Sequence, residues 1–274
     1  MINDCTVGHF IAAVLIQIQI SMTREGIFMI RFILICTVVI GYLILSIPLL
    51  IAEWILGKFA PLKKDFSSLR IIQGVFRLIL RIAGTKVTVI GEENVPKDTP
   101  VLYIGNHRSY FDIILTYSRC PIRTGYVAKK EMLRYPLLSN WMKYLHCLFL
   151  DRKDIKQGLQ TILTAIEKIK SGISICIFPE GTRNRNSSEQ ELLPFHEGSF
   201  KIATKTNCPI IPMALNNTAQ IFEAHTPRVT PCHVVLEYGK PIYPDQLDKE
   251  QKKHLGAYTR DVISEMLSKN KDLI

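Results

Sequence analysis

A histidine and an aspartate five positions apart, His107 and Asp112, form the first pattern in the sequence that could carry out chemistry. An aspartate that accepts the Nδ1 proton of a histidine fixes the tautomer of the ring and leaves Nε2 free as a general base. The pair is the histidine–carboxylate half of a catalytic triad, without a serine nucleophile assigned to it. Such a base would act directly on the hydroxyl group of a substrate.

The spacing of the two residues limits where they can lie. Five residues turn about 500° along an α-helix, which leaves the two side chains about 140° apart around it. They can meet if His107 lies in a turn after the apolar run Val101–Ile104 and Asp112 lies in the first turn of a helix. A structural interpretation stays open, because Ser109 and Asp112 also resemble a capping box, and a carboxylate favours the positive end of a helix dipole.

A second pattern lies at positions 178–183, which read Phe-Pro-Glu-Gly-Thr-Arg. A buried-type strand precedes it, and the Pro-Glu-Gly turn stops that strand. The turn would project Glu180 and Arg183 at a strand end, where α/β proteins bind their ligands. The guanidinium of Arg183 suits a phosphate, and Thr182 and the turn amides would add donors. The alternative is a surface turn with an exposed ion pair worth less than about 1 kcal/mol.

Two further strand ends carry cations. Lys129 follows the apolar run Gly125–Ala128, and Arg152 follows the run Cys147–Leu150. Together with Arg183, these residues would form an anion pocket beside a histidine base, which suits transfer of a group onto the hydroxyl of a phosphate ester. A nucleic-acid-binding protein would instead show a basic stripe with interleaved aromatic residues or a recognisable module, and we find neither.

A sheet is needed to bring these residues together, and the sequence after Thr85 predicts one. Short apolar runs alternate with helical patterns, which indicates an α/β domain over residues 85–274 with a mixed, largely parallel sheet covered by helices. Helices are expected over Asp154–Lys170 and, closing the domain, Asp245–Leu267. The strand candidates are Lys86–Ile90, Val101–Ile104, Gly125–Ala128, Cys147–Leu150, Ile173–Phe178, Ile210–Leu215 and Val234–Tyr238.

Residues 1–84 are expected to form an N-terminal membrane anchor of hydrophobic helices. Phe32–Ala52 is a run of 21 residues without a charge. As one helix it would be about 31 Å long, close to the thickness of the hydrocarbon core of a bilayer. The run therefore predicts a membrane span, although Pro48 near its end could break it into a partly inserted hairpin. The shorter apolar run Phe10–Ile20 could be a signal peptide, but this interpretation is less favoured, because no persuasive small-residue cleavage site is visible.

The segment Leu69–Ala83 reads as an amphipathic helix. Arg70, Arg77 and Arg81 share one face of it, opposite a set of apolar residues. It would either lie on an anionic bilayer with its apolar side down, or pack on the domain with its arginines in water. The cations that follow the apolar run predict, by the positive-inside rule, that the downstream domain lies in the cytoplasm.

The composition narrows the class of protein. The formal net charge of +10 favours an anionic partner such as a membrane surface, a nucleic acid or a phosphorylated substrate. The seven cysteines are odd in number and never spaced Cys-x-x-Cys, which argues against a zinc ribbon and a secreted disulfide scaffold.

Taken in order, the motifs resemble those of the glycerolipid acyltransferase superfamily, and within it the bacterial 1-acylglycerol-3-phosphate acyltransferases. They are Asn-His-x-x-x-x-Asp at 106–112, Phe-Leu-Asp-Arg at 149–152, Phe-Pro-Glu-Gly-Thr-Arg at 178–183 and Pro-Ile-Ile-Pro at 209–212. The resemblance covers roughly residues 85–240. It departs from the superfamily near His196, where members commonly carry a lysine.

The resemblance implies roles for individual residues. His107 would be the general base and Asp112 its orienting partner. The acceptor and its phosphate would be held by Lys129, Arg152, Glu180, Gly181 and Arg183. In the fourth motif, Pro212 matches the superfamily, and Ile210 and Ile211 would line the path of the donor's acyl chain or belong to the core.

The resemblance also implies a reaction. A fatty acyl group would pass from an acyl thioester, acyl-CoA or acyl carrier protein, to the free hydroxyl of 1-acyl-sn-glycerol-3-phosphate, forming phosphatidic acid without an acyl-enzyme. No metal or other cofactor is expected. The enzyme would work at the cell membrane, on an anionic surface. The acceptor could instead be glycerol-3-phosphate or another lysolipid, or the chain could be a catalytically silent membrane-binding scaffold.

Overall fold

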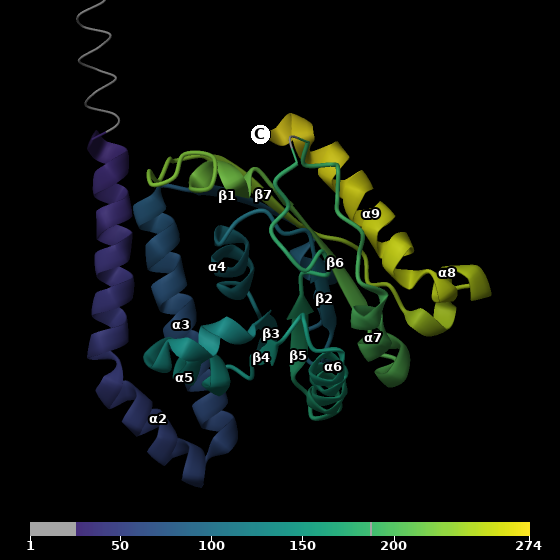
Figure 1. Ribbon diagram of the computed structural model, residues 1–274, viewed down its shortest axis with the longest axis horizontal. Helices are drawn as coiled ribbons and strands as arrows, with labels where there is room; N and C mark the ends of the chain where they lie inside the picture. The colour runs from purple at the N-terminus through teal and green to yellow at the C-terminus, as the bar shows by residue number, and fades with distance from the viewer. Residues whose placement is uncertain (1–25, 187) are drawn as a thin grey trace, which may run out of the picture.

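The structure is a computed structural model that describes residues 26–186 and 188–274 (Figure 1). The apolar run Phe10–Ile20 lies outside the described residues. After the N-terminal helices, strands alternate with helices, as the sequence predicts.

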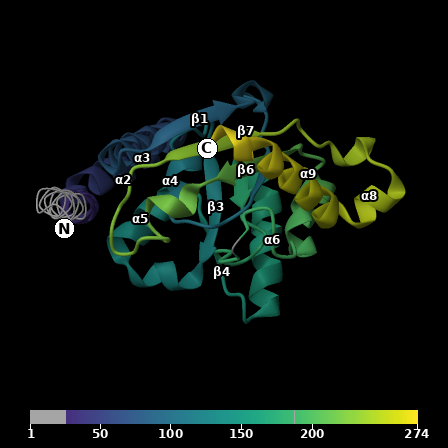
Figure 2. The ribbon, with the colours of Figure 1, turned by 90° about the horizontal axis from the view of Figure 1, so that it is seen from above.

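A seven-stranded sheet in the order β1-β7-β6-β2-β5-β3-β4 forms the centre of the molecule (Figures 1 and 2). Only the pair β6–β7 is antiparallel among the described strands, so the prediction of a mixed, largely parallel sheet is confirmed. Each strand matches a predicted run to within two residues. The strands are β1 (Lys86–Ile90), β2 (Leu102–Gly105), β3 (Thr124–Lys129), β4 (Leu148–Leu150), β5 (Ser174–Ile177), β6 (Ile210–Asn216) and β7 (His233–Tyr238).

Helices cover both faces of the sheet, because alternate residues of each buried strand point to opposite sides. One apolar core lies between the sheet and the helices α3 (Pro61–Ala83), α4 (Phe111–Tyr117) and α5 (Pro136–Tyr144). A second core lies between the sheet and α6 (Ile155–Lys170), α7 (Lys201–Thr206) and α9 (Leu255–Asn270). The two neighbouring residues Ile210 and Ile211 of β6 belong to different cores.

The two helices expected inside the domain differ in how well the sequence predicts them. Asp154 caps α6 by accepting a hydrogen bond from the backbone of Gln157 at 3.1 Å, close to the expected start. The closing helix starts four residues after and ends three residues after the predicted Asp245–Leu267, and it is divided in two. A capping box at Asp248 starts α8 (Lys249–Lys253), and the non-helical backbone of His254 separates α8 from α9.

The apolar run Phe32–Ala52 does not form one continuous helix. A helix over Gly26–Leu45 ends at a turn at Ser46, and α2 (Ile47–Phe59) follows at an angle to it (Figure 1). Pro48 lies in the first turn of α2, where its missing N–H costs no helical hydrogen bond. Within the part of the chain that the structure describes, Gly26–Leu45 alone is long and apolar enough to cross a membrane by length and composition.

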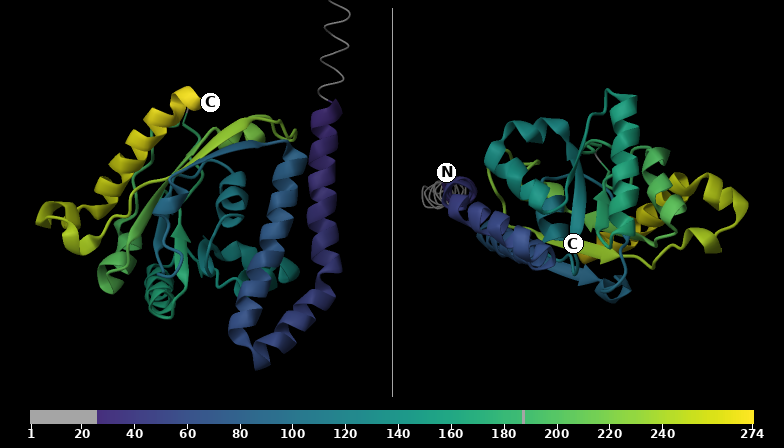
Figure 3. Two further views of the ribbon diagram at one scale, coloured as in Figure 1. Left: turned by 180° about the vertical axis from the view of Figure 1, so that it is seen from behind. Right: turned by 90° about the horizontal axis from the view of Figure 1, so that it is seen from below.

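One side of the helix Gly26–Leu45 packs along the α/β domain, next to α3 (Figures 1 and 3). The ring of Phe32 stacks on Phe222 at 5.6 Å between centroids, and the ring of Tyr42 lies 5.7 Å from that of Trp141. Arg31 donates to the carbonyl of Ala83 at the end of α3, at 3.1 Å.

The other side of this helix is apolar and exposed, and α2 continues it. We call this the anchor surface, and its exposed side chains include Ile30, Ile33, Ile40, Ile44, Ile51, Trp54 and Phe59. Exposed apolar side chains in such a continuous set mark an interaction surface.

The amphipathic helix α3 begins eight residues before the predicted Leu69. Its apolar side is buried in the first core, with Leu69, Ile72 and Ile79 at most 5% exposed. Arg70, Arg77 and Arg81 are exposed on its other side. This agrees with the second interpretation of the sequence, in which the helix packs on the domain with its arginines in water.

Candidate active site

Four neighbouring parallel strands place the predicted site residues along one edge of the sheet. The order β2-β5-β3-β4 means that the carboxyl ends of these strands follow one another at about 4.8 Å intervals. His107 follows β2, Glu180 and Arg183 follow β5, Lys129 ends β3, and Arg152 follows β4.

Asn106 holds the end of β2 against β6. Its side-chain oxygen accepts from the backbone N–H of Leu215 at 2.8 Å, and its amide donates to the carbonyl of Leu215 at 2.9 Å. Both atoms of a fully buried amide are therefore satisfied. The turn that carries His107 starts from this fixed point.

His107 and Asp112 lie in contact, in the arrangement that their spacing requires. His107 lies in the turn after β2, Asp112 lies in the first turn of α4, and Nδ1 of the histidine is 2.8 Å from Oδ2 of the aspartate. Among the described residues, Nε2 of His107 has no hydrogen-bond partner. The imidazole is therefore oriented at one nitrogen and open at the other.

The carboxylate of Asp112 is fully buried and accepts four hydrogen bonds. Besides His107, the backbone N–H groups of Arg108 and Ser109 each donate to Oδ2 at 2.7 Å. The hydroxyl of Thr218 donates to Oδ1 at 2.5 Å. The capping-box interpretation holds in part: Asp112 accepts from the N–H of Ser109, but the Ser109 hydroxyl accepts from the N–H of Phe111 and not from that of Asp112.

The ring of His107 stacks on Phe178, with 4.5 Å between centroids and 18° between planes. Phe178 is the first residue of the 178–183 motif, so the two motifs meet through these rings. The side chain of His107 is 15% exposed, which leaves a path for a substrate to one of its edges.

Glu180 supports the backbone of the site from a buried position. Its carboxylate is buried and accepts from the N–H of His107 at 2.8 Å and from the N–H of Leu193 at 3.0 Å. Burial raises the pKa of this carboxyl, and these hydrogen bonds oppose the rise. Next to it, Gly181 has a φ of +71°, and a Cβ there would lie 3.0 Å from the imidazole of His196.

Arg183 is held by two side chains, Glu223 and Tyr110, that are not among the defining residues of the motifs. Its Nη1 donates to Glu223 at 2.9 Å, and its Nη2 donates to the hydroxyl of Tyr110 at 3.2 Å. The guanidinium also lies over the ring of Tyr110, 3.8 Å from its centroid. The second carboxylate oxygen of Glu223 is buried and has no hydrogen-bond partner in residues 26–186 and 188–274.

Lys129, Arg152 and Thr182 are exposed at the same edge of the sheet. The lysine that contacts the Phe-Leu-Asp-Arg motif is the neighbouring Lys130, which forms an ion pair with Asp151. Lys129 and Arg152 make no ion pair within the described residues, so both remain available to an anion.

The fourth motif lies inside the sheet. Ile210 and Ile211 are 0% exposed, and Pro212 is buried beside them in β6. Register pairs Ile210 with Leu102 and Pro212 with Ile104, so the motif runs alongside β2 and ends three residues before the level of His107. This placement fits the core alternative for the two isoleucines and gives no support to an acyl path along them.

Several residues of the site escape sequence analysis. Thr218 lies more than a hundred residues from its partner Asp112 in the sequence. Glu223 lies about forty residues from its partner Arg183. No spacing rule links such pairs. Tyr110 occupies an unspecified position of the first motif, and its contact with Arg183 in the structure is what identifies it as a site residue. Within the described residues, no group of three or more His, Cys, Asp or Glu side chains is arranged to hold a metal ion.

Comparison with known proteins agrees with this geometry. A family model described as "Acyltransferase" matches residues 86–216, which contain both motifs of the site. A 1-acyl-sn-glycerol-3-phosphate acyltransferase of Borreliella burgdorferi is 32% identical over 198 residues, covering 72% of this chain and 77% of the relative. That of Cocos nucifera is 34% identical over 179 residues, 65% of this chain. The chain spans 56% and 58% of the length of the Cocos nucifera and Limnanthes douglasii relatives.

A solved structure shares the fold. The crystal structure of the 1-acyl-sn-glycerophosphate (LPA) acyltransferase PlsC from Thermotoga maritima superposes with a TM-score of 0.76 at 23% sequence identity. The match covers 90% of this chain and 99% of that one.

Proposed function

Since the chain belongs to the acyltransferase family, we propose that it transfers a fatty acyl group from a thioester to the free hydroxyl of 1-acyl-sn-glycerol-3-phosphate. The donor is acyl-CoA or acyl carrier protein, and the product is phosphatidic acid. The proposal is supported by relatives named 1-acyl-sn-glycerol-3-phosphate acyltransferase. The single observation that carries it is the contact of His107 with Asp112, which leaves Nε2 without a hydrogen-bond partner among the described residues.

In this reaction, Nε2 of His107 accepts the proton of the acceptor hydroxyl as its oxygen attacks the thioester carbonyl carbon. The C–O bond of the new ester forms and the C–S bond breaks. The departing thiolate then takes the proton from the imidazolium. No acyl-enzyme is formed, because the acceptor oxygen attacks the thioester directly. A positioned base of this kind typically supplies about 10²- to 10⁴-fold in rate.

Asp112 serves this step by holding the ring and balancing the imidazolium charge. Its buried carboxylate is fixed by the Arg108 and Ser109 amides and by Thr218, so the charge is in place before the proton moves. Glu180 acts one step further away, because it holds the backbone of His107.

Arg183 is proposed to bind the phosphate of the acceptor. A guanidinium pairs with two phosphate oxygens at once, which fixes the orientation of the glycerol hydroxyl as well as its position. Lys129 and Arg152, at the next strand ends, are proposed to add positive charge for the phosphate. No cofactor takes part in the steps proposed here.

The test is a transfer assay with purified protein, 1-acyl-sn-glycerol-3-phosphate and a labelled acyl-CoA or acyl carrier protein. We expect labelled phosphatidic acid from the wild type and a loss of about 10²- to 10⁴-fold in kcat for His107→Ala. Arg183→Gln is expected chiefly to raise KM for the acceptor, because the phosphate contact exists in ground and transition state alike.

Four results would contradict the proposal in different ways. Equal activity of His107→Ala would remove base catalysis. A fall confined to kcat in Arg183→Gln would remove the phosphate assignment. Product with glycerol-3-phosphate or another lysolipid alone would change the acceptor, and no product with any acceptor would favour a silent scaffold.

We further propose that the protein is bound to the cell membrane by the anchor surface, with the catalytic domain on the cytoplasmic side. The helix Gly26–Leu45 carries domain contacts at the neighbouring residues Arg31 and Phe32 and, about three turns later, at Tyr42. A helix packed along a water-soluble domain is better suited to lie partly inserted than to cross the bilayer. The cations after the apolar run support the cytoplasmic side.

A further inference from the structure

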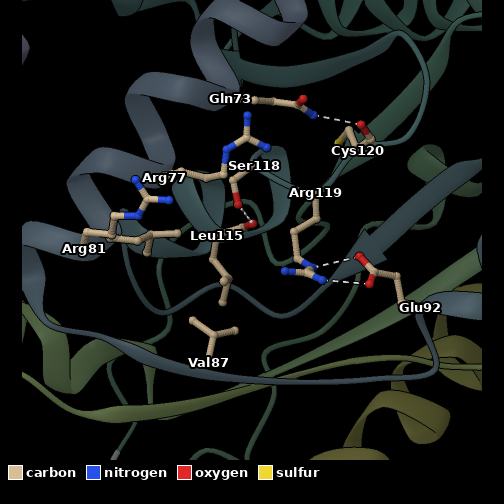
Figure 4. A pocket seen from close by; sticks show the side chains of 10 residues that line it. Gln73, Arg77, Arg81, Val87, Glu92, Leu115, Ser118, Arg119 and Cys120 are labelled. Atoms are coloured by element: carbon tan, nitrogen blue, oxygen red, sulfur yellow. Dashed lines mark hydrogen bonds and ion pairs between the residues drawn. The ribbon is translucent and has the colours of Figure 1, made fainter.

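A cavity of about 460 Å³ lies between α3, the end of α4 and the edge strand β1 (Figure 4). Its apolar lining comes from Leu80, Val87 and Leu115, and its polar lining is dominated by arginines. None of the residues proposed to bind or activate the acceptor lines it.

The cavity and the predicted active site lie at opposite ends of α4. Asp112 is in the first turn of this helix, whereas Ser118 and Arg119, which line the cavity, follow its last residue. Six residues of helix separate Asp112 from Ser118 by about 9 Å along the helix axis. A phosphate group bound in the cavity would therefore lie apart from the catalytic pair.

Three guanidinium groups surround the cavity. Arg77 and Arg81 project from consecutive turns of α3, and Arg119 approaches from the end of α4 (Figure 4). Glu92 is the one carboxylate among the lining residues. The lining thus carries a net positive charge and suits an anion.

The hydrogen bonds around the cavity show which donors remain for a ligand. Arg119 donates Nε and Nη2 to the two oxygens of Glu92, at 2.8 and 2.7 Å, and keeps Nη1 free. In the part of the chain that the structure describes, the side chains of Arg77 and Arg81 have no hydrogen-bond or ion-pair partner. Gln73 already donates to the carbonyls of Cys120 and Tyr117.

The position of the cavity brings it close to the anchor. Arg31, in the helix that carries the anchor surface, donates to the carbonyl of Ala83, two residues after Arg81 on α3. Free guanidinium donors that converge on one cavity are the arrangement that binds phosphate oxygens.

We propose that this cavity is a second phosphate site, which takes the phosphate group of an anionic ligand. The ligand is either a phospholipid head group of the bilayer that holds the anchor surface or a soluble phosphate ester. The site requires no acyl transfer, so its test is independent of the proposed activity.

The first arm of the test measures flotation of the full chain with phosphatidylcholine vesicles, with and without phosphatidylglycerol. Arg77→Gln and Arg119→Gln are each expected to lower binding to the anionic vesicles about fivefold, the size expected for one near-surface cation. The matched control is Arg70→Gln, which removes the same charge from the exposed face of α3 outside the cavity. Its binding is expected to change less than twofold.

Glu92→Gln separates a ligand effect from a folding effect. Arg119→Gln and Glu92→Gln both break the same ion pair, so any loss of stability has the same sign in both. Binding of phosphate should weaken in the first variant and strengthen in the second, because the second makes the cavity more positive.

The second arm titrates inorganic phosphate into protein in neutral detergent and follows the thermal unfolding midpoint. It uses the Arg183→Gln background, which removes the phosphate contact proposed for the active site. A rise in midpoint that Arg77→Gln and Arg119→Gln abolish assigns a soluble phosphate. If binding depends on these arginines in the vesicle experiment but not in the phosphate titration, the ligand is a lipid head group. Equal losses in Arg70→Gln, or weaker binding in Glu92→Gln, would overturn the proposal.

Discussion

Among the residues of the candidate site, Asp112 is fixed by four hydrogen bonds that do not depend on substrate. Its carboxylate is therefore organised in advance, and little rearrangement is left for the moment at which His107 becomes charged. The same two backbone amides that hold Asp112 also set the shape of the turn after β2. The catalytic pair and the turn thus stabilise each other.

Arg183, in contrast, is not free of intramolecular partners, because a carboxylate already accepts a hydrogen bond from its guanidinium group. Glu223 accepts from Nη1 of Arg183 and also from the N–H of Tyr110 at 2.8 Å. A phosphate that binds Arg183 must share the guanidinium with Glu223 or displace it. Glu223 therefore competes with the acceptor for one positive charge.

Glu223→Gln tests this competition. The amide can keep a hydrogen bond to Arg183 but loses the negative charge, so phosphate binding should improve. We expect KM for the acceptor to fall up to about fivefold with kcat unchanged, the upper limit for a partly exposed ion pair. Steady-state kinetics over a range of acceptor concentration measure it. A higher KM would mean that Glu223 chiefly positions Arg183.

Sequence reasoning reaches some of these residues and not others, for a physical reason. His107 and Asp112 are linked by local geometry, since a strand-to-helix turn is the way for residues five apart to meet. Glu223 and Thr218 approach the site only because β6 lies beside β2 in the sheet. Contacts of that kind follow from strand order, which local spacing does not contain.

At the scale of elements, apolar patterns locate strands better than they predict burial. All seven strand candidates are present, since each is a short apolar run between turn residues. The apolar stripe of α6 is wider than its buried side, because Leu159 and Leu163 are 57% and 45% exposed. The run Phe32–Ala52 is uniformly apolar and so carries no signal for the turn at Ser46 apart from Pro48.

The start of α3 is held against the domain by one carboxylate with three basic side chains around it. Asp65 lies 2.9 Å from Nε2 of His146, 3.3 Å from Nη1 of Arg123 and 3.4 Å from Nζ of Lys64. Burial alone would raise the pKa of this carboxyl, but His146, Lys64 and Arg123 together hold it below its usual value. The cluster thus joins the anchor segment to the loops before β3 and β4.

Asp65→Asn is expected to destabilise the protein by about 3 kcal/mol at neutral pH, the lower end for breaking a buried ion pair. Because the folded pKa is depressed, the stability supplied by Asp65 is present above about pH 4 and is lost as pH falls through the folded pKa. Thermal unfolding midpoints of variant and wild type should therefore converge in acid. The control is Asp98→Asn, an exposed carboxylate whose one hydrogen bond, among the residues that the structure describes, comes from the Thr99 hydroxyl. Parallel pH curves for wild type and Asp65→Asn would contradict the assignment.

At the scale of the whole molecule, the anchor surface lies on one flank, and α6 offers a matched surface on the domain. Changing Ile33, Ile40 and Ile44 together to serine should lower vesicle binding about a hundredfold, because about 3 kcal/mol of apolar burial is lost. The control changes Ile155, Leu159 and Leu163 of α6 to serine, which are also exposed. Flotation with neutral vesicles measures both. Equal losses would show that the bilayer contacts α6 as well.

The stacking of Phe32 on Phe222 has a practical consequence for anyone who shortens the chain to obtain a more tractable enzyme. Phe222 supports the helix, and the next residue, Glu223, is the counter-ion of Arg183. Cutting away the helix removes the support beneath that short stretch of backbone. A truncated protein would then show an altered affinity for phosphate. Its kinetic constants would reflect the truncation as well as the enzyme itself.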